Sequence, residues 1–240
     1  MITIWGGQTS RSIRVAWLLE EMGLPYGVRQ VDMLAADKDP AWLAINPGDF
    51  LPAIQDGDVT MVESVAIMEY LMGRYGPTPL QPLPDDVAFP TYQQFLHMGE
   101  AGLATLIMVP LVSGFIAPEV ERDNWGARWA RECVERRLLL VRRQLAAAPY
   151  MAGDRFTAAD ISVTYALNLG ANHAGFVLSD AEQAYLARNT ARAPTSAHST
   201  DRTTAWQNRP AQVIGYLEFR TAAGSAEQMA KLGKRSGRVE

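Results

Sequence analysis

The chain has 240 residues, of which 48% are hydrophobic and 20% charged, and its formal net charge at pH 7 is −4. This length predicts one or two domains, and the composition is typical of a globular protein with enough apolar material for a full core. A net negative charge gives no basis for nucleic acid as a partner. The single cysteine, Cys133, excludes an internal disulfide framework and suits a reducing compartment.

The first residues and the hydropathy pattern indicate where in the cell the protein is located. Residues 1–10 are too short and too polar a stretch for a secretory signal peptide. No run approaches the roughly 18 apolar residues that a membrane span needs. We therefore expect a cytoplasmic protein with no membrane partner.

The first third of the chain alternates strand-like and helical patterns. A β-prone run at 2–5 stops at two glycines, and the apolar residues that follow recur at helical spacing up to Gly23, a suitable residue after a helix end. Further elements are expected in the order strand, short helix, hairpin and helix, at 26–31, 39–44, 51–62 and 64–76. With a parallel first strand pair, this order is the thioredoxin-like arrangement.

The stretch 46–64 is the most informative part of this region. Leu51-Pro52 leads into a strand, Asp56-Gly57 predicts a tight hairpin turn, and Glu63-Ser64 opens a helix. Only X-Pro bonds readily take the cis form. A cis bond here would turn the main-chain groups of Leu51 outward, free to pair with the backbone of a ligand.

The rest of the chain is predicted to be helical. Residues 77–88 carry four prolines and two acids and are interpreted as a linker between a first domain, 1–76, and an all-helical domain, 89–192. Pro110, Gly114 and Pro118 are expected to break or kink the first helix of that domain, and a long helix is expected over 119–147. Residues 193–240 show no periodic pattern of apolar residues and are expected to form an irregular, poorly ordered tail.

One helix start in the second half has two agreeing signals. Thr157 and Asp160 have the spacing of a capping box, and the apolar run that follows begins at Ile161. Phe156, before the cap, and Ile161 have the spacing of a hydrophobic staple. We therefore expect a helix to begin at this point.

Four segments together resemble the cytosolic glutathione transferase family. They are SRSIRVAWLLEEMGLPY, NPGDFLPAI, ESVAIMEYLMGRYG and MAGDRFTAADISVTYAL, which occur in that order within residues 1–190. The resemblance implies an α/β N-terminal thioredoxin-like domain that binds glutathione, plus an all-α C-terminal helical domain that supplies the electrophile pocket. It also implies a homodimer.

The resemblance assigns roles in glutathione binding within the stretch 46–64. The main chain of Leu51, before the cis Pro52, pairs with the cysteinyl unit, and Glu63 with Ser64 holds the γ-glutamyl end. Physical chemistry agrees, because a helix N-terminus presents free N–H groups and a positive dipole end to an α-carboxylate.

The thiol-activating group is expected in the loop before the first helix. The position used by serine-type members falls on Thr9, with Ser10 adjacent, and both remain candidates. A hydroxyl that donates to the sulfur stabilises thiolate over thiol. The loop has no tyrosine or cysteine, which favours a serine/threonine-type, bacterial-like member. Ser10 and Ser12 are also ordinary helix-cap residues.

Two residues depart from the family pattern. Where the family has glycine and then a basic or polar residue before the cis-proline dipeptide, this chain has Asp49-Phe50. An acid there would repel an anionic ligand, and Phe50 cannot pair with the glycyl carboxylate. Lys38 or Gln8 is expected to substitute.

The remaining candidates concern the electrophile and the reaction class. His97 and Met98 lie on the first helix of the second domain and are candidate contacts for the electrophile, although both residue types also serve as packing or surface groups. No Cys/His cluster at metal-ligand spacing is found, so no metal is expected. The predicted function is conjugation of the glutathione thiolate, as co-substrate, to a small apolar electrophile. Alternatives are a glutathione-dependent disulfide reductase or peroxidase and a non-enzymatic ligand-binding protein on the same fold.

Overall fold

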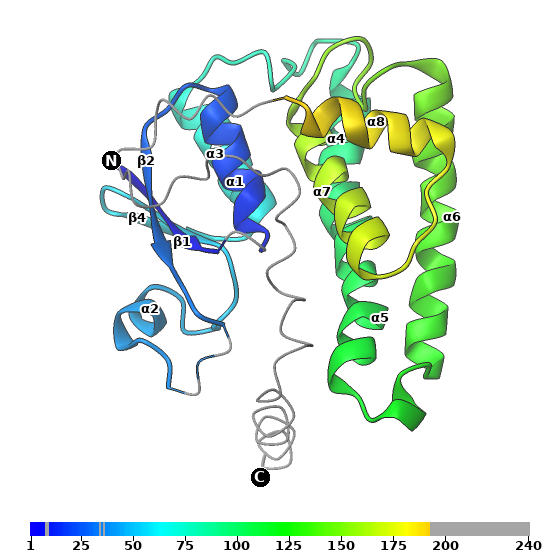
Figure 1. Cartoon of the computed structure of the whole chain (residues 1–240). Helices are drawn as coiled ribbons and strands as arrows, with labels where there is room; N and C mark the ends of the chain where they lie inside the picture. The colour runs from blue at the N-terminus through cyan, green and yellow to red at the C-terminus, as the bar shows by residue number, and fades with distance from the viewer. Residues whose placement is uncertain (8–9, 34, 36, 193–240) are drawn as a thin grey trace.

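The structure is a computed structural model that describes residues 1–7, 10–33, 35 and 37–192 (Figure 1). It contains an α/β unit at the N-terminus and a helical unit beside it. The predicted tail, 193–240, lies outside the described residues, as do Gln8 and Thr9.

The N-terminal unit is a four-stranded mixed sheet with three helices. The strand order is β2-β1-β3-β4, with β1 parallel to β2 and antiparallel to β3. This is the arrangement that the order of the predicted elements indicated. The elements are β1 (Ile2–Gly6), α1 (Ser12–Glu21), β2 (Tyr26–Gln30), α2 (Pro40–Ile45), β3 (Ala53–Asp56), β4 (Val59–Val62) and α3 (Ser64–Tyr75).

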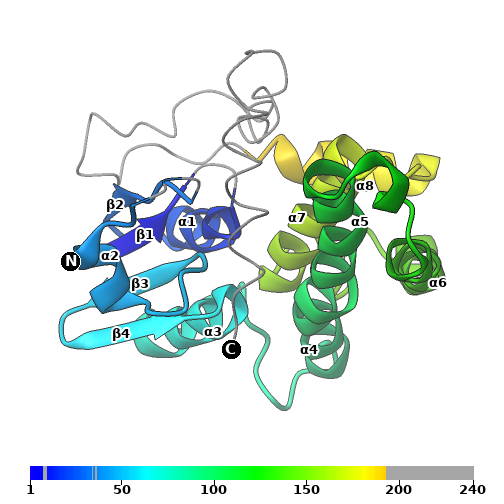
Figure 2. The same cartoon turned by 90° about the horizontal axis from the view of Figure 1, so that it is seen from below.

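The two faces of the sheet are covered differently. On one face α2 inserts Trp42, which is 1% exposed and stacks on Trp5 with ring centroids 6.1 Å apart. Helices α1 and α3 cover the other face and separate the sheet from the helical unit (Figure 2). Ile4 and Ile54 belong to a core that continues through these helices into the helical unit. The two units therefore share one apolar core.

The helical unit follows a linker, 77–88, that holds neither helix nor strand. Its elements are α4 (Phe89–His97), the π-helical segment η1 (Met98–Ala104), α5 (Thr105–Ile116), the 3₁₀ turn η2 (Glu119–Glu121), α6 (Trp125–Ala147), α7 (Ala158–His173) and α8 (Asp180–Thr190). The first four-fifths of the chain thus has the fold class that the sequence indicated.

Two helix boundaries differ from the sequence prediction. Helix α5 continues through Pro110 and Gly114 and ends only before Pro118, because α5 packs along α6 and this packing outweighs the hydrogen bond that a proline removes. Helix α6 begins at Trp125 and not at 119. The side chain of Asn124 accepts a hydrogen bond from the amide of Ala127 at 3.0 Å and sets that start.

The prediction that no run approaches membrane-spanning length missed one segment. Helices α4, η1 and α5 run on as Phe89–Ile116, 28 residues whose best window has a mean hydropathy of 1.6. By length and composition alone this segment could cross a membrane. A core helix passes the same test. This segment packs against α6 and α7, and 28% of the window is buried.

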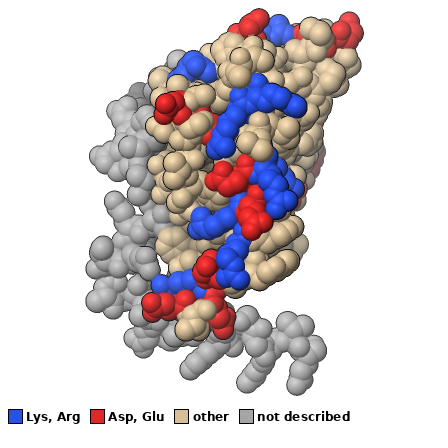
Figure 3. All heavy atoms as spheres, turned by 90° about the vertical axis from the view of Figure 1, so that its right-hand side faces the viewer, with Lys and Arg blue, Asp and Glu red and all other residues tan. Residues whose placement is uncertain are grey.

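Helix α6 carries six of the ten arginines in residues 89–192, and Arg128, Arg136 and Arg143 are exposed on its outward face. Acidic and basic side chains alternate along this face (Figure 3). Arg136 lies 3.0 Å from Glu132, and Arg142 lies 3.7 Å from Glu135. The arginines of α6 therefore do not form an uninterrupted basic patch on this face.

The capping box at the start of α7 is present as predicted. Asp160 is 0% exposed, and its carboxylate accepts from the amides of Met151 and Thr157, both at 2.8 Å, and from the Tyr185 hydroxyl at 2.9 Å. Phe156 and Ile161 are both buried, as a hydrophobic staple requires. One carboxylate thus joins the helix start to the preceding loop and to α8.

Asp160→Ala is expected to lower the free energy of unfolding by about 3 kcal/mol or more. The change leaves four buried donors without this acceptor, the Thr157 hydroxyl at 3.1 Å being the fourth. Each unmade bond costs about 1–3 kcal/mol. Urea unfolding would measure the loss. Asp154→Ala, at an exposed position in the preceding loop, is the control and should change the value by less than about 0.5 kcal/mol. Equal effects of the two changes would contradict this account.

Candidate functional site

Two of the predicted ligand-binding residues, Leu51 and Ser64, lie with Gly7 in one row at one end of the sheet. Trp5 pairs with Ala53, and Ala53 pairs with Val62. Gly7, Leu51 and Ser64 each lie two residues beyond these last paired positions, so all three lie at the same end of the sheet. Three segments that are remote in the chain therefore meet here: the loop before α1, the entry to β3 and the start of α3.

Leu51 has a main chain that is available to a ligand. The Leu51–Pro52 bond is cis. Strand β3 begins only at Ala53, and no main-chain hydrogen bond joins Leu51 to another residue of the described part of the chain. Within that part of the chain its amide and carbonyl groups have no main-chain partner, as pairing with an extended peptide would require.

Ser10 closes the turn before α1. Its hydroxyl donates to the Gly7 carbonyl at 3.0 Å, accepts from the Ser12 amide at 3.2 Å and lies 2.5 Å from the Ser12 hydroxyl. Ser12 is itself buried. The single proton of the Ser10 hydroxyl thus already has an acceptor within the protein.

Arg14, on α1, is the principal site residue that the sequence analysis missed. It is 0% exposed, and its Nη1 donates to the Ser64 hydroxyl at 3.2 Å. The same nitrogen bonds to the carboxylate of Glu100 in η1. Its Nη2 donates to the Gly99 and Ser162 carbonyl oxygens at 3.2 and 3.4 Å. Arg14 therefore connects α1, α3, η1 and α7.

Glu100 supplies the negative charge that this buried cation needs. It bonds to Arg14 and to Arg11, whose Nε lies 2.8 Å away, and it accepts from Thr105 at 2.9 Å. Burial by itself raises the pKa of Glu100, but the charges and hydrogen bonds of the two arginines outweigh burial and lower the pKa to about 2. Glu100 is therefore ionised throughout the physiological pH range.

The π-helical segment η1 packs directly against α7, with almost no space between the two main chains. This contact positions Glu100. A Cβ placed on Gly99 would lie 2.6 Å from the main-chain carbon of Ser162, so only glycine allows this approach. Extra residues in a helical turn are frequent at functional sites. In the sequence, the only signals of this ion pair were Arg14, a cation beside the apolar face of α1, and Glu100, an acid between two glycines.

Ser64 and Glu63 stand at the N-terminus of α3. Ser64 is 2% exposed, and Glu63 is exposed with a φ of 71°. A non-glycine residue in the left-handed region is uncommon and occurs where the surroundings hold it, frequently at functional sites. Glu63 makes no side-chain cap bond to α3. Its carboxylate is thus not used in closing the helix start.

Lys38, the predicted partner of a ligand carboxylate, is already paired with a carboxylate. Its Nζ lies 3.2 Å from Asp49, and Asp49 also accepts from the Trp42 indole at 2.7 Å. The acid that the sequence analysis flagged as repulsive is thus neutralised by the residue proposed to compensate for it.

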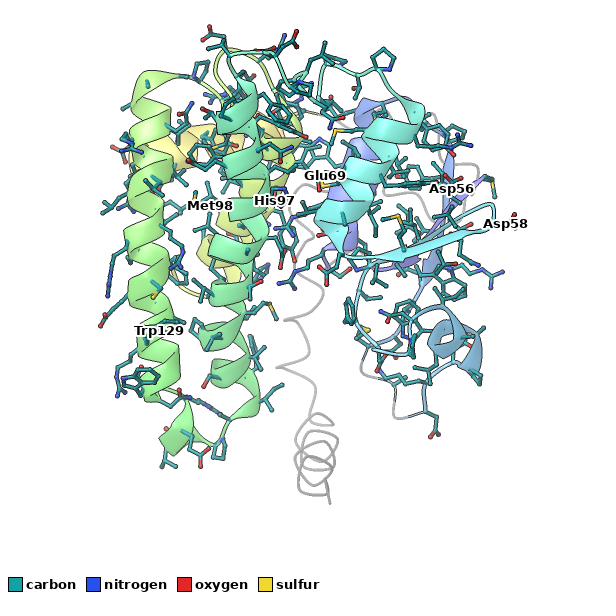
Figure 4. All side chains as sticks on the ribbon, turned by 180° about the vertical axis from the view of Figure 1, so that it is seen from behind. Asp56, Asp58, Glu69, His97, Met98 and Trp129 are labelled. Carbon is teal, nitrogen blue, oxygen red and sulfur yellow. The ribbon has the colours of Figure 1, made fainter. Side chains whose placement is uncertain are left out.

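His97 and Met98 point in different directions. His97 has a side chain 54% exposed, and its Nε2 lies 3.1 Å from Gln93 and 3.4 Å from Glu69 of α3. Figure 4 shows His97 facing Glu69, whereas Met98 points toward α6. Met98 packs against the core. The structure therefore does not bring the two side chains together.

Two hollows in the described surface lie away from this row. One of about 510 Å³ lies between α7 and α8, and one of about 680 Å³ follows the linker. Neither is lined by a predicted site residue. Among the described residues, no group of three or more His, Cys, Asp or Glu could hold a metal ion.

Comparison with known proteins gives the family. Residues 1–73 match the family described as "Glutathione S-transferase, N-terminal domain". The chain is 31% identical over 172 residues to Glutathione S-transferase 3 of Schizosaccharomyces pombe, covering 67% of this chain and 70% of that protein. The chain belongs to the glutathione transferase family. Glutathione S-transferase 3 of Zea mays is a further relative, 32% identical over 157 residues, covering 62% of this chain and 68% of that protein.

A solved structure of a glutathione transferase has the same fold over nearly its whole length. The theta class enzyme of Xanthomonas axonopodis pv. citri, with glutathione bound, has a TM-score of 0.68 and 27% identity. The match covers 85% of this chain and 99% of that chain. The fold with the two units described above is therefore shared with a solved transferase.

Glu100→Gln is expected to lower the free energy of unfolding at pH 7 by about 3–5 kcal/mol, because it leaves Arg14 buried without a counter-ion. The pKa of Glu100 in the folded chain is depressed from 4.5 to about 2. The stability that it contributes is therefore present above pH 4.5 and is lost as the pH falls toward 2.

Urea unfolding of the wild type and Glu100→Gln at pH 7, 5 and 3 would test this expectation. The difference between the two proteins should shrink at pH 3. Glu132→Gln removes a pair whose glutamate is 67% exposed, and it should cost less than about 1 kcal/mol at every pH. A difference that does not depend on pH would contradict the assignment.

Proposed function

We propose that this chain binds glutathione along the row Gly7, Leu51 and Ser64 and conjugates its thiolate to a small apolar electrophile. The observation that carries the proposal is the bond from Arg14 to Ser64. Because the guanidinium occupies an acceptor site of the Ser64 hydroxyl, the hydroxyl proton remains for a ligand. With the N-terminal amides of α3, this donor suits the α-carboxylate of a γ-glutamyl group.

The other contacts follow from the same row. The free main chain of Leu51 would pair with the cysteinyl unit, and the exposed carboxylate of Glu63 would answer the α-ammonium of the ligand. The cysteinyl sulfur would then lie toward the loop at Gly7, at the N-terminus of α1. Family relatives named glutathione S-transferase, and a neighbour with glutathione bound, support this reading of the site.

Thr9 is our first candidate for the thiol-activating hydroxyl. The Ser10 proton is already bonded to the Gly7 carbonyl, so Ser10 would have to give up that hydrogen bond in order to donate to sulfur. Lowering the thiol pKa by one to two units takes about 1.4–2.7 kcal/mol. One hydrogen bond to the thiolate together with the dipole of α1 covers this amount.

The electrophile would lie on the helical side of the row. There α5 exposes an apolar side formed by Val109, Val112 and Ile116, which are 41%, 40% and 59% exposed. His97 remains a candidate contact, while Met98 is proposed with less support because it packs against the core. A homodimer and a cytoplasmic location belong to this proposal as well.

Ser64→Ala is expected to weaken glutathione binding by about tenfold or more, since a hydrogen bond to a charged group contributes about 1.5–3 kcal/mol. Titration calorimetry would measure the Kd. Thr60→Ala, which removes an exposed hydroxyl from β4, should leave the affinity unchanged. Undiminished binding to Ser64→Ala would contradict the γ-glutamyl assignment.

Thr9→Ala is expected to lower kcat/KM for conjugation of a chlorinated nitroarene by at least about tenfold and to move the rise of the rate with pH upward by one to two units. Thr9→Ser should restore most of the rate. A larger loss from Ser10→Ala, with Thr9→Ala near wild type, would assign the role to Ser10.

Two outcomes in the wild type would favour the other reaction classes. Glutathione binding without conjugation would favour a ligand-binding protein. Turnover of a small mixed disulfide in place of the nitroarene would favour a glutathione-dependent reductase.

A further inference from the structure

The position of Asp49 bears on which thiol this site accepts, provided that the proposed function holds. A tripeptide held at Ser64 by its γ-glutamyl end and at Leu51 by its middle residue carries its third residue away from Ser64. A ligand that pairs with Leu51 as an added antiparallel strand places its next residue opposite Phe50, beside Asp49. The C-terminal carboxylate of the co-substrate would therefore lie close to Asp49 and its contacts.

Lys38 is the cation at this place, and its protons already have acceptors. The Nζ atom lies 2.7 Å from the Met33 carbonyl oxygen, 3.5 Å from the Asp32 carbonyl oxygen and 3.2 Å from the Asp49 carboxylate. A lysine ammonium has three donors and no more. A ligand carboxylate that approaches Lys38 therefore has to displace Asp49 or share its proton.

The other cations of the α/β unit are placed elsewhere. Residues 1–76 contain five Lys and Arg against ten Asp and Glu. Arg11 and Arg14 bind Glu100, Arg29 lies over an indole ring at 5.0 Å, and Arg74 is in the last turn of α3. Arg29 lies over Trp5, the ring that stacks on Trp42. Among the described residues no ion pair joins any of these four to Asp49, so Lys38 is the cation that neutralises this carboxylate.

Asp49 is held in place and cannot easily turn away. Its Oδ1 accepts from the indole of Trp42 at 2.7 Å, and Trp42 is 1% exposed. Its φ of 50° lies in the left-handed region, which aspartate and asparagine tolerate better than most residues. The carboxylate thus has a fixed direction, and its side chain remains 31% exposed toward solvent.

We propose that this site selects γ-glutamylcysteinyl thiols whose C-terminal end carries no charge, such as an amide or an ester, and that Asp49 is the residue that determines this specificity. The γ-glutamyl and cysteinyl contacts are shared by both kinds of thiol. A free C-terminal carboxylate adds a second anion beside the neutral pair of Asp49 and Lys38, whereas an amide adds none. Discrimination by a repulsive element of this kind is common at specific sites.

Asp49→Asn is a matched test of this inference. Asparagine keeps an oxygen for the Trp42 indole and tolerates the same φ, but it removes the charge and releases Lys38. We would compare kcat/KM for glutathione and for glutathione C-terminal amide, with a fixed chlorinated nitroarene. Calorimetry with the S-hexyl derivatives of both thiols would give the corresponding ratio of Kd values. Asp58→Asn, at an exposed position of the β3–β4 turn, is the control for charge.

The wild type should use the amide at least as well as glutathione. Asp49→Asn should shift the ratio about fivefold toward glutathione, the effect of one partly exposed ion pair, and Asp58→Asn should not. Two results would overturn the inference and leave the proposed function standing. One is a wild type whose kcat/KM is about tenfold higher for glutathione than for the amide. The other is a ratio of the two kcat/KM values that Asp49→Asn leaves unchanged. Failure of the wild type to bind either S-hexyl derivative would overturn both.

Discussion

The guanidinium of Arg14 lies between the two units with no exposed surface, and its charge is met by Glu100 from the π-helical turn. An unpaired cation in such a place would cost several kcal/mol. The pairing joins η1 to α1, and the same guanidinium donates to the Ser64 hydroxyl. Together with the shared apolar core, it holds the helical unit against the α/β unit.

A buried ion pair is weak evidence for net stability, because desolvation of both charges offsets much of their attraction. The role of this ion pair is to fix the geometry of the site. Arg14 acts as a donor to Ser64 and so leaves the serine proton for a carboxylate ligand. A hydrophobic pair of similar volume would fill the same space, but it would leave the hydroxyl free to rotate. Under the proposed function, Glu100 of the helical unit would therefore influence glutathione binding in the α/β unit through Arg14.

Much of the fold follows from local signals. The start of α7 was predictable because Thr157, Asp160 and the Phe156–Ile161 staple act within one helical turn. The hairpin at Asp56-Gly57 was predictable for the same reason. The course of α5 through Pro110 was not, because packing along α6 outweighs the local cost of a proline. The start of α6 at Trp125 depends on one asparagine cap within a stretch that is helical by composition throughout.

The sequence by itself determined the family, the order of strands and helices, and the placement of Leu51 and Ser64 at element ends where their polar groups can face a ligand. Only the tertiary structure decided which charges neutralise one another. Arg14 and Glu100 are 86 positions apart, and Lys38 meets Asp49 across a loop and a helix. Local periodicity reports which face of a helix is apolar, but the partner of a buried or half-buried charge depends on which remote segment the fold brings within about 4 Å of it.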